Sequence, residues 1–154
     1  MFDIEKFIDI DYLTEDRIER KKKTQEVFTP YCIVKKLMDN ISEEDWADPD
    51  KTFLDPAGGN GNIVLGILYR RIHEYNIPWQ KALENMYTLE LMEDNVQESR
   101  QRVHELLRNI APDYSPSVAD EIMDKNFVCS DFFTWNFEEW HPYTEEELKK
   151  IKRK

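Results

Sequence analysis

The stretch Thr52-Phe-Leu-Asp-Pro-Ala-Gly-Gly-Asn-Gly-Asn62 contains three of the four glycines of this chain. A short apolar run, Phe53-Leu54, precedes the glycines, and a helical pattern that begins near Ile63 follows them. A strand that ends in a glycine turn and continues into a helix is typical of loops that bind a nucleotide-like cofactor. The sequence therefore predicts a cofactor loop at this point of the chain.

The acid at the start of this loop, Asp55, indicates the charge of the ligand. A carboxylate would repel a phosphate group but would attract a cationic one. S-adenosylmethionine carries a sulfonium and an ammonium group and no phosphate, so Asp55 favours this cofactor. A nicotinamide site needs the order G-x-G-x-x-G and a P-loop needs G-K-[ST]. The order G-G-x-G of this chain fits neither.

Composition predicts a single soluble domain. The chain has 154 residues, of which 40% are hydrophobic and 34% are charged. No apolar run approaches the roughly 18 residues of a membrane span, and no secretory signal is recognisable. Cys32 and Cys129 lie far apart without metal-ligand spacing, which favours two reduced thiols in a cytoplasmic protein.

The net charge of -11 disfavours long-range attraction of nucleic acid. Binding of DNA would then depend on local basic patches or on a partner. Two basic stretches, residues 17–23 and 149–154, could serve, although lysine runs of this kind are usually solvated. We therefore expect any contact with DNA to be weak for the chain alone.

Helical and strand patterns alternate along the chain, which predicts a parallel sheet with right-handed crossovers in an α/β, Rossmann-like fold. We expect strands at residues 52–54, 86–89 and 127–129, and helices at 30–41, 62–75, 78–83, 93–110, 117–124 and 145–152, with a short helical turn after Ser42. Thr29 is the expected N-cap of the helix that opens at Pro30. One face of this helix should pack inward, because apolar residues recur at helical spacing: Ile33, Val34, Leu37, Met38 and Ile41. As a single domain, residues 1–154 would comprise a helical arm (1–23), a cofactor-binding core (24–133) and an aromatic and basic tail (134–154).

Each predicted strand is closed by an acid: Asp55, Glu90 and Asp131. Because parallel strands end at the same edge of a sheet, these acids should lie along one edge. Ligands of open α/β sheets bind at that carboxyl edge. The alternative interpretation of Glu90 and Asp131 is that each caps a turn or a helix.

Four ordered motifs between about residues 24 and 133 resemble class I S-adenosylmethionine-dependent methyltransferases, and more narrowly the N6-adenine DNA methyltransferases and restriction-system modification subunits. The segment Asp55-Pro-Ala-Gly-Gly-Asn-Gly-Asn62 is similar to the family pattern D-P-A-C-G-S-G-N, with Gly58 at the Cys position, a small change. The other motifs are Glu26-Val-Phe-Thr-Pro30, Leu89-Glu-Leu-Met-Glu-Asp-Asn95 and Ser130-Asp-Phe-Phe133. The resemblance implies a truncated class I fold of about three core strands, of the short phage type, in the cytoplasm of a bacterial or phage-infected cell.

The resemblance also implies which residues bind the cofactor: Thr29, Pro30, Asp55, Pro56, Ala57, Gly58, Gly59, Asn60, Gly61, Asn62, Glu90, Leu91, Asp131 and Phe132. In the family, Asp55 and the loop backbone would hold the amino-acid end, and Glu90 would accept both ribose hydroxyls. Leu91 and Phe132 would pack beside the adenine ring, and Asp131 would accept its amino group. Thr29 would contact the cofactor from the other side, a role compatible with an N-cap.

The family's acceptor motif, [DNS]-P-P-[YFW], has no counterpart here, so we predict no catalytic residue. The nearest segment, Trp140-His-Pro-Tyr143, reads as a loop. The family's fourth strand is also missing, so the first strand should have an open edge that needs cover. Candidates for that cover are the N-terminal arm, the aromatic tail around Trp135 and Phe137, a second copy or a partner subunit; the aromatic residues could equally pack in the chain's own core.

Three functions remain open from the sequence. The first is a partner-dependent role in DNA adenine methylation. The second is a catalytically inactive cofactor-binding or antirestriction protein that interacts with host restriction-modification enzymes. The third, a lyase or hydrolase that consumes the cofactor, has no supporting constellation of residues.

Overall fold

The computed structural model describes residues 1–10, 18–20, 23 and 28–152. Within these residues, three strands form a parallel sheet of order β1-β2-β3: β1 (Phe53–Asp55), β2 (Met86–Glu90) and β3 (Phe127–Cys129). Helices connect successive strands, as the right-handed crossovers of a parallel sheet require. The predicted α/β fold with a parallel sheet is confirmed, and each predicted strand agrees with the observed one to within a residue.

The register of the sheet separates its side chains into two faces. Phe53 pairs with Met86 and Thr88 pairs with Phe127, so these residues point to one face. All four are buried. The residues between them, Leu54, Tyr87, Leu89 and Val128, point to the opposite face.

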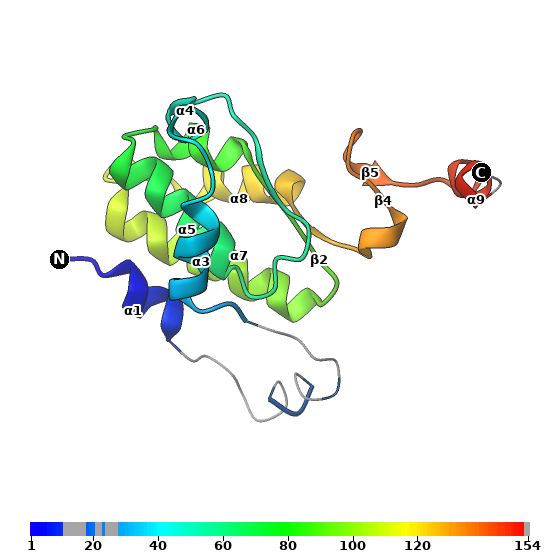
Figure 1. Ribbon diagram of the computed structural model, residues 1–154, viewed down its shortest axis with the longest axis horizontal. Coiled ribbons are helices and arrows are strands. Elements are labelled where there is room, and N and C mark those ends of the chain that lie inside the picture. The colour runs from blue at the N-terminus through cyan, green and yellow to red at the C-terminus, as the bar shows by residue number, and fades with distance from the viewer. Residues whose placement is uncertain (11–17, 21–22, 24–27, 153–154) are drawn as a thin grey trace.

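Helices cover the first face of the sheet, where the main hydrophobic core lies (Figure 1). The helical elements, in chain order, are α1 (Ile4–Asp9), α3 (Tyr31–Met38), α4 (Glu43–Ala47), α5 (Asn62–Tyr69), the π-helical turn η1 (Arg70–Glu74), α6 (Trp79–Glu84), α7 (Glu93–Ile110) and α8 (Pro116–Asn126). Helix α5 is apolar on nearly all sides because it lies between the sheet, α3, α1 and α7. None of the helices in the described part of the chain is both long and apolar enough to cross a membrane.

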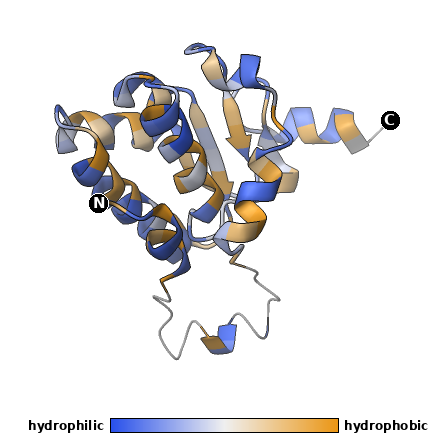
Figure 2. Cartoon of the chain, turned by 60° about the vertical axis from the view of Figure 1, so that its left-hand side comes forward, coloured by the Kyte–Doolittle hydropathy of each residue, from blue (hydrophilic) through white to orange (hydrophobic). Residues whose placement is uncertain are grey.

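The C-terminal tail lies on the other side of the sheet from the helices (Figure 2). It consists of the 3₁₀ turn η2 (Phe132–Thr134), a short antiparallel hairpin of β4 (Trp135–Asn136) and β5 (His141–Pro142), and α9 (Glu145–Lys152). Leu89 and Trp135 are buried but are not part of the main core cluster. The tail therefore forms a second, smaller apolar layer on the sheet face opposite the described helices of the core.

Most predicted helices are confirmed with small changes at their ends. Helix α7 has the predicted bounds, and Ser42 caps α4 by accepting a hydrogen bond from Asp45 N. The predicted capping box of α9 is present, because Thr144 Oγ1 accepts from Glu147 N while Glu147 Oε1 accepts from Thr144 N. The helix predicted for residues 62–75 is continuous, but its last turn is π-helical.

Three expectations about local structure are wrong. Pro30, not Thr29, is the N-cap of α3, because its backbone is extended (ψ 158°) and helical geometry begins only at Tyr31. Only half of the predicted apolar face of α3 is buried: Val34 and Met38 pack inward, whereas the neighbouring Ile33 and Leu37 are exposed. The segment 140–143 is not simply a loop, because it includes β5 of the hairpin.

Candidate functional site

The glycine loop joins β1 to α5 at the carboxyl edge of the sheet. Gly58 N donates to Leu89 O of β2 at 2.9 Å, which fixes the loop over the neighbouring strand. Gly59 (φ 54°) and Gly61 (φ 96°) have left-handed backbones, a conformation that favours glycine. A Cβ atom at Gly61 would also lie 2.7 Å from Cβ of Ser99 on α7. The loop therefore requires its second and third glycines and lies directly against α7.

The first glycine of the loop has a different constraint. A Cβ atom at Gly58 would lie 2.2 Å from Oγ1 of Thr88, which donates to Asp55 O at 3.0 Å. Cys at this position is common in the family that the loop resembles, and the sequence suggested that Gly was a small change. The structure corrects this, since Thr88 fills the space that a side chain at position 58 would need.

Asp55 holds its carboxyl group in a buried position at the end of β1, with 7% of the residue exposed. Its Oδ1 accepts a hydrogen bond from Ala57 N at 3.2 Å, whereas Oδ2 has no hydrogen-bond partner among the described residues. Burial raises the pKa of Asp55, and the nearby Glu90 carboxylate adds to that rise, while the hydrogen bond from Ala57 opposes it. An unpartnered buried carboxylate oxygen is unfavourable unless a donor or a cation reaches it.

Glu90, at the end of β2, connects the glycine loop to the start of α7. Its Oε1 accepts from Gly59 N at 3.3 Å, and its Oε2 accepts from Met92 N and Asn95 Nδ2, each at 3.0 Å. An ionised carboxylate has about four acceptor positions, and these bonds use three of them. Glu90 therefore caps the turn at the start of α7, which was the alternative interpretation of this acid. About one acceptor position of its carboxylate remains for a ligand.

Asp131 lies beyond the end of β3, where Ser130 N donates to Glu90 O. The carboxylate of Asp131 accepts from Phe133 N at 2.9 Å and so caps η2, which was the alternative interpretation of this acid. Leu91, after β2, is 63% exposed, and Phe132, the residue after Asp131, is 47% exposed. The acids at the ends of β1 and β2 thus contact the glycine loop, whereas Asp131 contacts its own turn.

Thr29 contacts the loop through its backbone: its carbonyl oxygen accepts from Asn62 Nδ2 at 2.7 Å. Thr29 also lines a small hollow of about 20 Å³, together with Phe28, Ala57, Gly58, Gly59, Asn60, Asn62 and Ile63. Pro30 follows, exposed, at the start of α3, and Pro56 is half-buried beside Asp55. A volume of this size holds about one water molecule, whereas small-molecule sites usually enclose about 300–1,000 Å³. A cofactor would therefore lie across the open carboxyl edge.

Arg102 of α7 is a buried residue of this region that the sequence did not single out. Its Nη1 donates to Asn60 O at 3.0 Å and to Asn62 Oδ1 at 2.6 Å, and its Nη2 donates to the carbonyls of Phe7 and Ile8 at the end of α1. A signal was present, because Asn95, Ser99 and Arg102 share the face of α7 that also carries Val103 and Leu106. Polar residues on a buried helical face indicate a specific polar contact.

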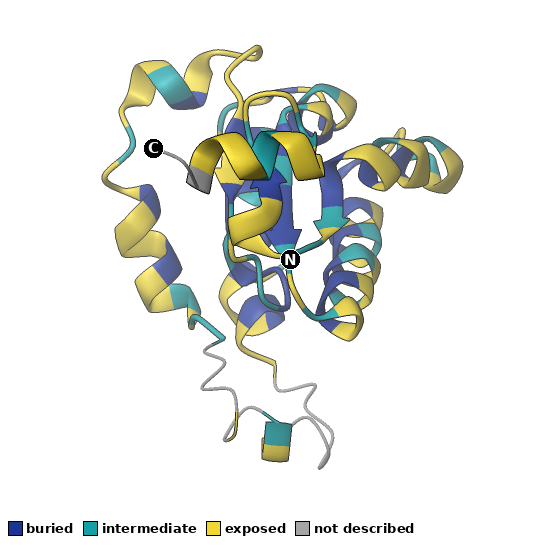
Figure 3. Ribbon diagram, turned by 90° about the vertical axis from the view of Figure 1, so that its right-hand side faces the viewer, coloured by how far each residue is buried: buried dark blue, intermediate teal, exposed yellow. Residues whose placement is uncertain are grey.

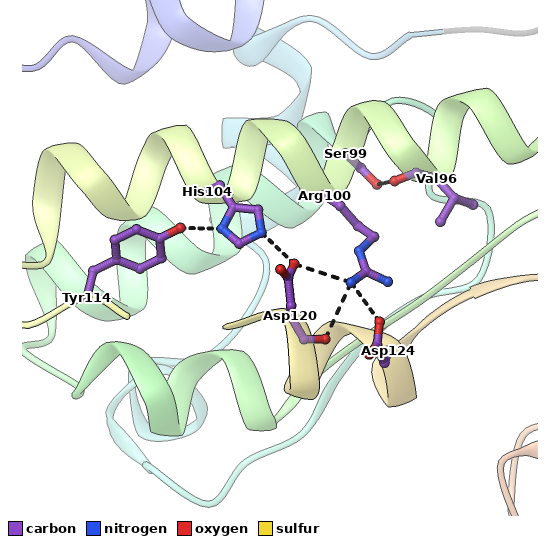
Figure 4. A network of polar contacts seen from close by, with 7 residues as sticks. All are labelled: Val96, Ser99, Arg100, His104, Tyr114, Asp120 and Asp124. Carbon is purple, nitrogen blue, oxygen red and sulfur yellow. Dashed lines mark hydrogen bonds and ion pairs between the residues drawn. The ribbon is translucent and has the colours of Figure 1, made fainter. Parts of the chain in front are cut away.

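A second polar cluster joins α7 to α8 (Figure 4). His104 Nε2 lies 2.7 Å from Asp120 Oδ1, and His104 Nδ1 contacts the hydroxyl of Tyr114. Arg100 Nη2 donates to Asp124 at 2.7 Å and to Asp120 at 3.4 Å. Each of these groups is satisfied by its neighbours, so we interpret the cluster as a helix-to-helix connection. No group of three or more His, Cys, Asp and Glu side chains within the described ranges is arranged to hold a metal ion.

The tail does not resemble an acceptor site. Trp140 packs edge-on against Tyr87 of β2, with ring centroids 5.0 Å apart, and its Nε1 donates to Lys125 O at 2.7 Å. His141 contacts Glu139 and the carbonyl of Pro142 within the same hairpin. Of the two basic stretches, residues 149–152 form the end of α9, while only 18–20 and 23 of the first stretch are described.

Comparison with known proteins gives no match: no family model, curated protein or solved structure matches this chain.

Proposed function

We propose that this chain binds S-adenosylmethionine at the carboxyl edge of its sheet and takes part in methylation of adenine in DNA together with a partner protein. The observation that carries the proposal is the buried carboxylate of Asp55, whose Oδ2 has no partner in the described part of the chain. A ligand with a cationic amino-acid end would provide the missing donor and offset the buried charge. When bound, S-adenosylmethionine supplies an electrophilic methyl group.

The glycine loop supports the same ligand. Gly59 and Gly61 keep side chains away from the edge, so the backbone beside Asp55 is accessible to the amino-acid end of the cofactor. Leu91 and Phe132 are exposed apolar side chains where the adenine ring would pack. Asp131 would accept the adenine amino group through the carboxylate oxygen that does not cap Phe133.

Glu90 would bind the ribose, but with a rearrangement. Two ribose hydroxyls need two acceptor positions, and the present contacts leave one. The longest of these contacts, from Gly59 N at 3.3 Å, is the one we expect to open. Cofactor binding would then loosen the loop from β2 while Met92 and Asn95 keep hold of the other oxygen.

Titration calorimetry with S-adenosylmethionine tests the proposal. Asp55→Asn keeps the shape of the side chain and removes its charge, so we expect affinity to fall by about tenfold or more, the size of one charge-assisted hydrogen bond. Asp120→Asn, in the α7–α8 cluster, is the matched control and should bind like the parent protein. Equal affinity for the parent and Asp55→Asn, or no binding by the parent, would end the proposal.

A cofactor-binding protein without catalytic activity is the second candidate function. The observation that favours it is the tail, where Trp140 and His141 are engaged within the hairpin and against the sheet. Incubation with tritiated S-adenosylmethionine and adenine-containing DNA, with and without bacterial lysate, separates the two. Label that reaches DNA only when lysate and this chain are both present supports the methylation role; binding without transfer supports the second candidate.

A further inference from the structure

The outer edge of β1 is an exposed sheet edge. Among the described residues, β1 has β2 as its only strand neighbour. Phe53 N donates to Asn85 O at 2.8 Å, on the side of β2. Because backbone groups alternate in direction along a strand, Thr52 and Leu54 direct their N–H and C=O groups away from β2. Such groups are a template for pairing with another chain.

A hollow of about 320 Å³ adjoins this edge. Its walls come from β1, β2 and the tail: Thr52, Phe53, Leu54, Tyr87, Phe137, Glu138 and Trp140. Leu54 is 46% exposed at its rim, although it belongs to a strand of the central sheet. The hollow therefore offers aromatic walls directly beside backbone groups that have no strand partner in the described part of the chain. These are the two features that recognise an extended peptide.

The charges around the edge select the occupant. Glu138 is the charged residue among those that line the hollow, whereas Asp50, in the turn before β1, is already paired with Lys81 of α6 at 2.6 Å. The chain as a whole carries a net charge of -11. A second copy would bring the same charge to the same edge and would be repelled, whereas a basic segment would be attracted.

We propose that an extended, basic segment of a different protein pairs with β1 and inserts an apolar side chain into the hollow between the sheet and the tail. A Lys or Arg residue of this segment faces Glu138, and the backbone of the segment bonds to Thr52 and Leu54. This binding is independent of the ligand of the glycine loop, so failure of the calorimetric test leaves it unaffected.

Selection from a phage-displayed library of random dodecapeptides, with the full chain as bait, tests the proposal. We expect recovered peptides to alternate apolar residues with Lys or Arg. A synthetic peptide from the selection is then titrated by fluorescence polarisation. Leu54→Pro removes the outward N–H and leaves the β2 side intact, so it should weaken binding about tenfold or more, while Leu54→Val retains the N–H and should bind within about twofold. Glu138→Lys should also weaken binding.

A second measurement does not rely on how the variants fold. N-methylation of alternate peptide amides should abolish binding in one of the two possible registers and spare it in the other. No enriched peptide, acidic enriched peptides, or equal binding of both N-methylated forms would overturn the proposal. Self-association in sedimentation velocity that Leu54→Pro removes would also overturn it, since a second copy would then occupy the edge.

Discussion

The carboxyl group of Asp55 links stability to the candidate function at the scale of a single residue. Its raised pKa means that the folded state holds the proton more tightly than the unfolded chain does. The stabilisation from this proton is complete below the unfolded pKa and is lost as the pH rises through the folded pKa. Above the unfolded pKa, folding must therefore either bury the charged carboxylate or take up a proton, and both oppose folding.

We predict that Asp55→Asn raises the melting temperature of the ligand-free protein at neutral pH, by about 3 °C for an effect on the order of 1 kcal/mol. The difference should shrink as the pH falls toward the folded pKa of Asp55, because the parent side chain then becomes neutral. Differential scanning fluorimetry across pH measures this directly. A difference that does not change with pH would contradict the assignment of the effect to charge.

Asp120→Asn is a control for which we expect the opposite change in stability at neutral pH. The hydrogen bond with His104 lowers the pKa of Asp120, so the carboxylate contributes stability above its unfolded pKa and loses it as the pH falls through the folded value. The variant should be less stable than the parent at neutral pH, and the gap should close in acid. Stabilisation of both variants at neutral pH would indicate a general charge effect instead.

At the scale of elements, Arg102 connects α1, the glycine loop and α7 through four hydrogen bonds from a buried side chain. We predict that Arg102→Met lowers the free energy of unfolding by about 2–4 kcal/mol, because buried carbonyls of the loop and of α1 lose their donor. Urea denaturation measures the loss. Arg108→Lys, at an exposed position of the same helix, should change stability by about 0.5 kcal/mol or less.

Hydrogen exchange separates loss of this connection from general destabilisation. If Arg102 holds the elements together, amides of residues 4–10 and 58–62 should exchange faster in Arg102→Met under conditions where β2 remains protected. A uniform increase over the whole chain would show that Arg102 contributes to global stability only. Arg102→Lys should give intermediate exchange, since one ammonium group reaches fewer of the carbonyls than a guanidinium fork.

The elements that the sequence predicted well are those set by local patterns. The strands that begin at Phe53, Met86 and Phe127 are short apolar runs closed by polar residues. In α7, apolar residues recur at helical spacing without a Pro or Gly between them. Contacts distant in sequence were not predictable in this way. Arg102 donates to residues 40 to 95 positions away. The buried residues of α3, Val34 and Met38, are those that lie beside Gly66 of α5.

For the candidate site, the sequence predicted which residues come together but not how their side chains are bonded. Asp55 and Glu90 do meet around the glycine loop, as the ends of parallel strands require. The sequence could not show that Glu90 is already bonded to Gly59, Met92 and Asn95, or that Thr88 occupies the space beside Gly58. Both facts depend on side-chain positions across two strands.

At the scale of the whole molecule, the described helices of the main core lie on one face of the sheet, and the tail lies on the other, the side turned toward the viewer in Figure 3. Trp140 is the centre of this contact: its ring lies against Tyr87 and Trp135, and its Nε1 bonds to Lys125 O. If the tail covers the sheet as a structural element, its removal should expose apolar strand residues such as Leu89 to solvent.

We predict that Trp140→Ala lowers the free energy of unfolding by about 2 kcal/mol, less than for a fully buried ring because Trp140 is half-buried. The variant should also bind the dye ANS while keeping its far-ultraviolet circular dichroism, since the helical layer does not depend on the hairpin. Phe133→Ala is the matched control: Phe133 is 82% exposed in the same tail, and its loss should change stability by about 0.5 kcal/mol or less. Equal effects of the two substitutions would show that the hairpin does not protect this face, and the hollow beside β1 would then lack its second wall.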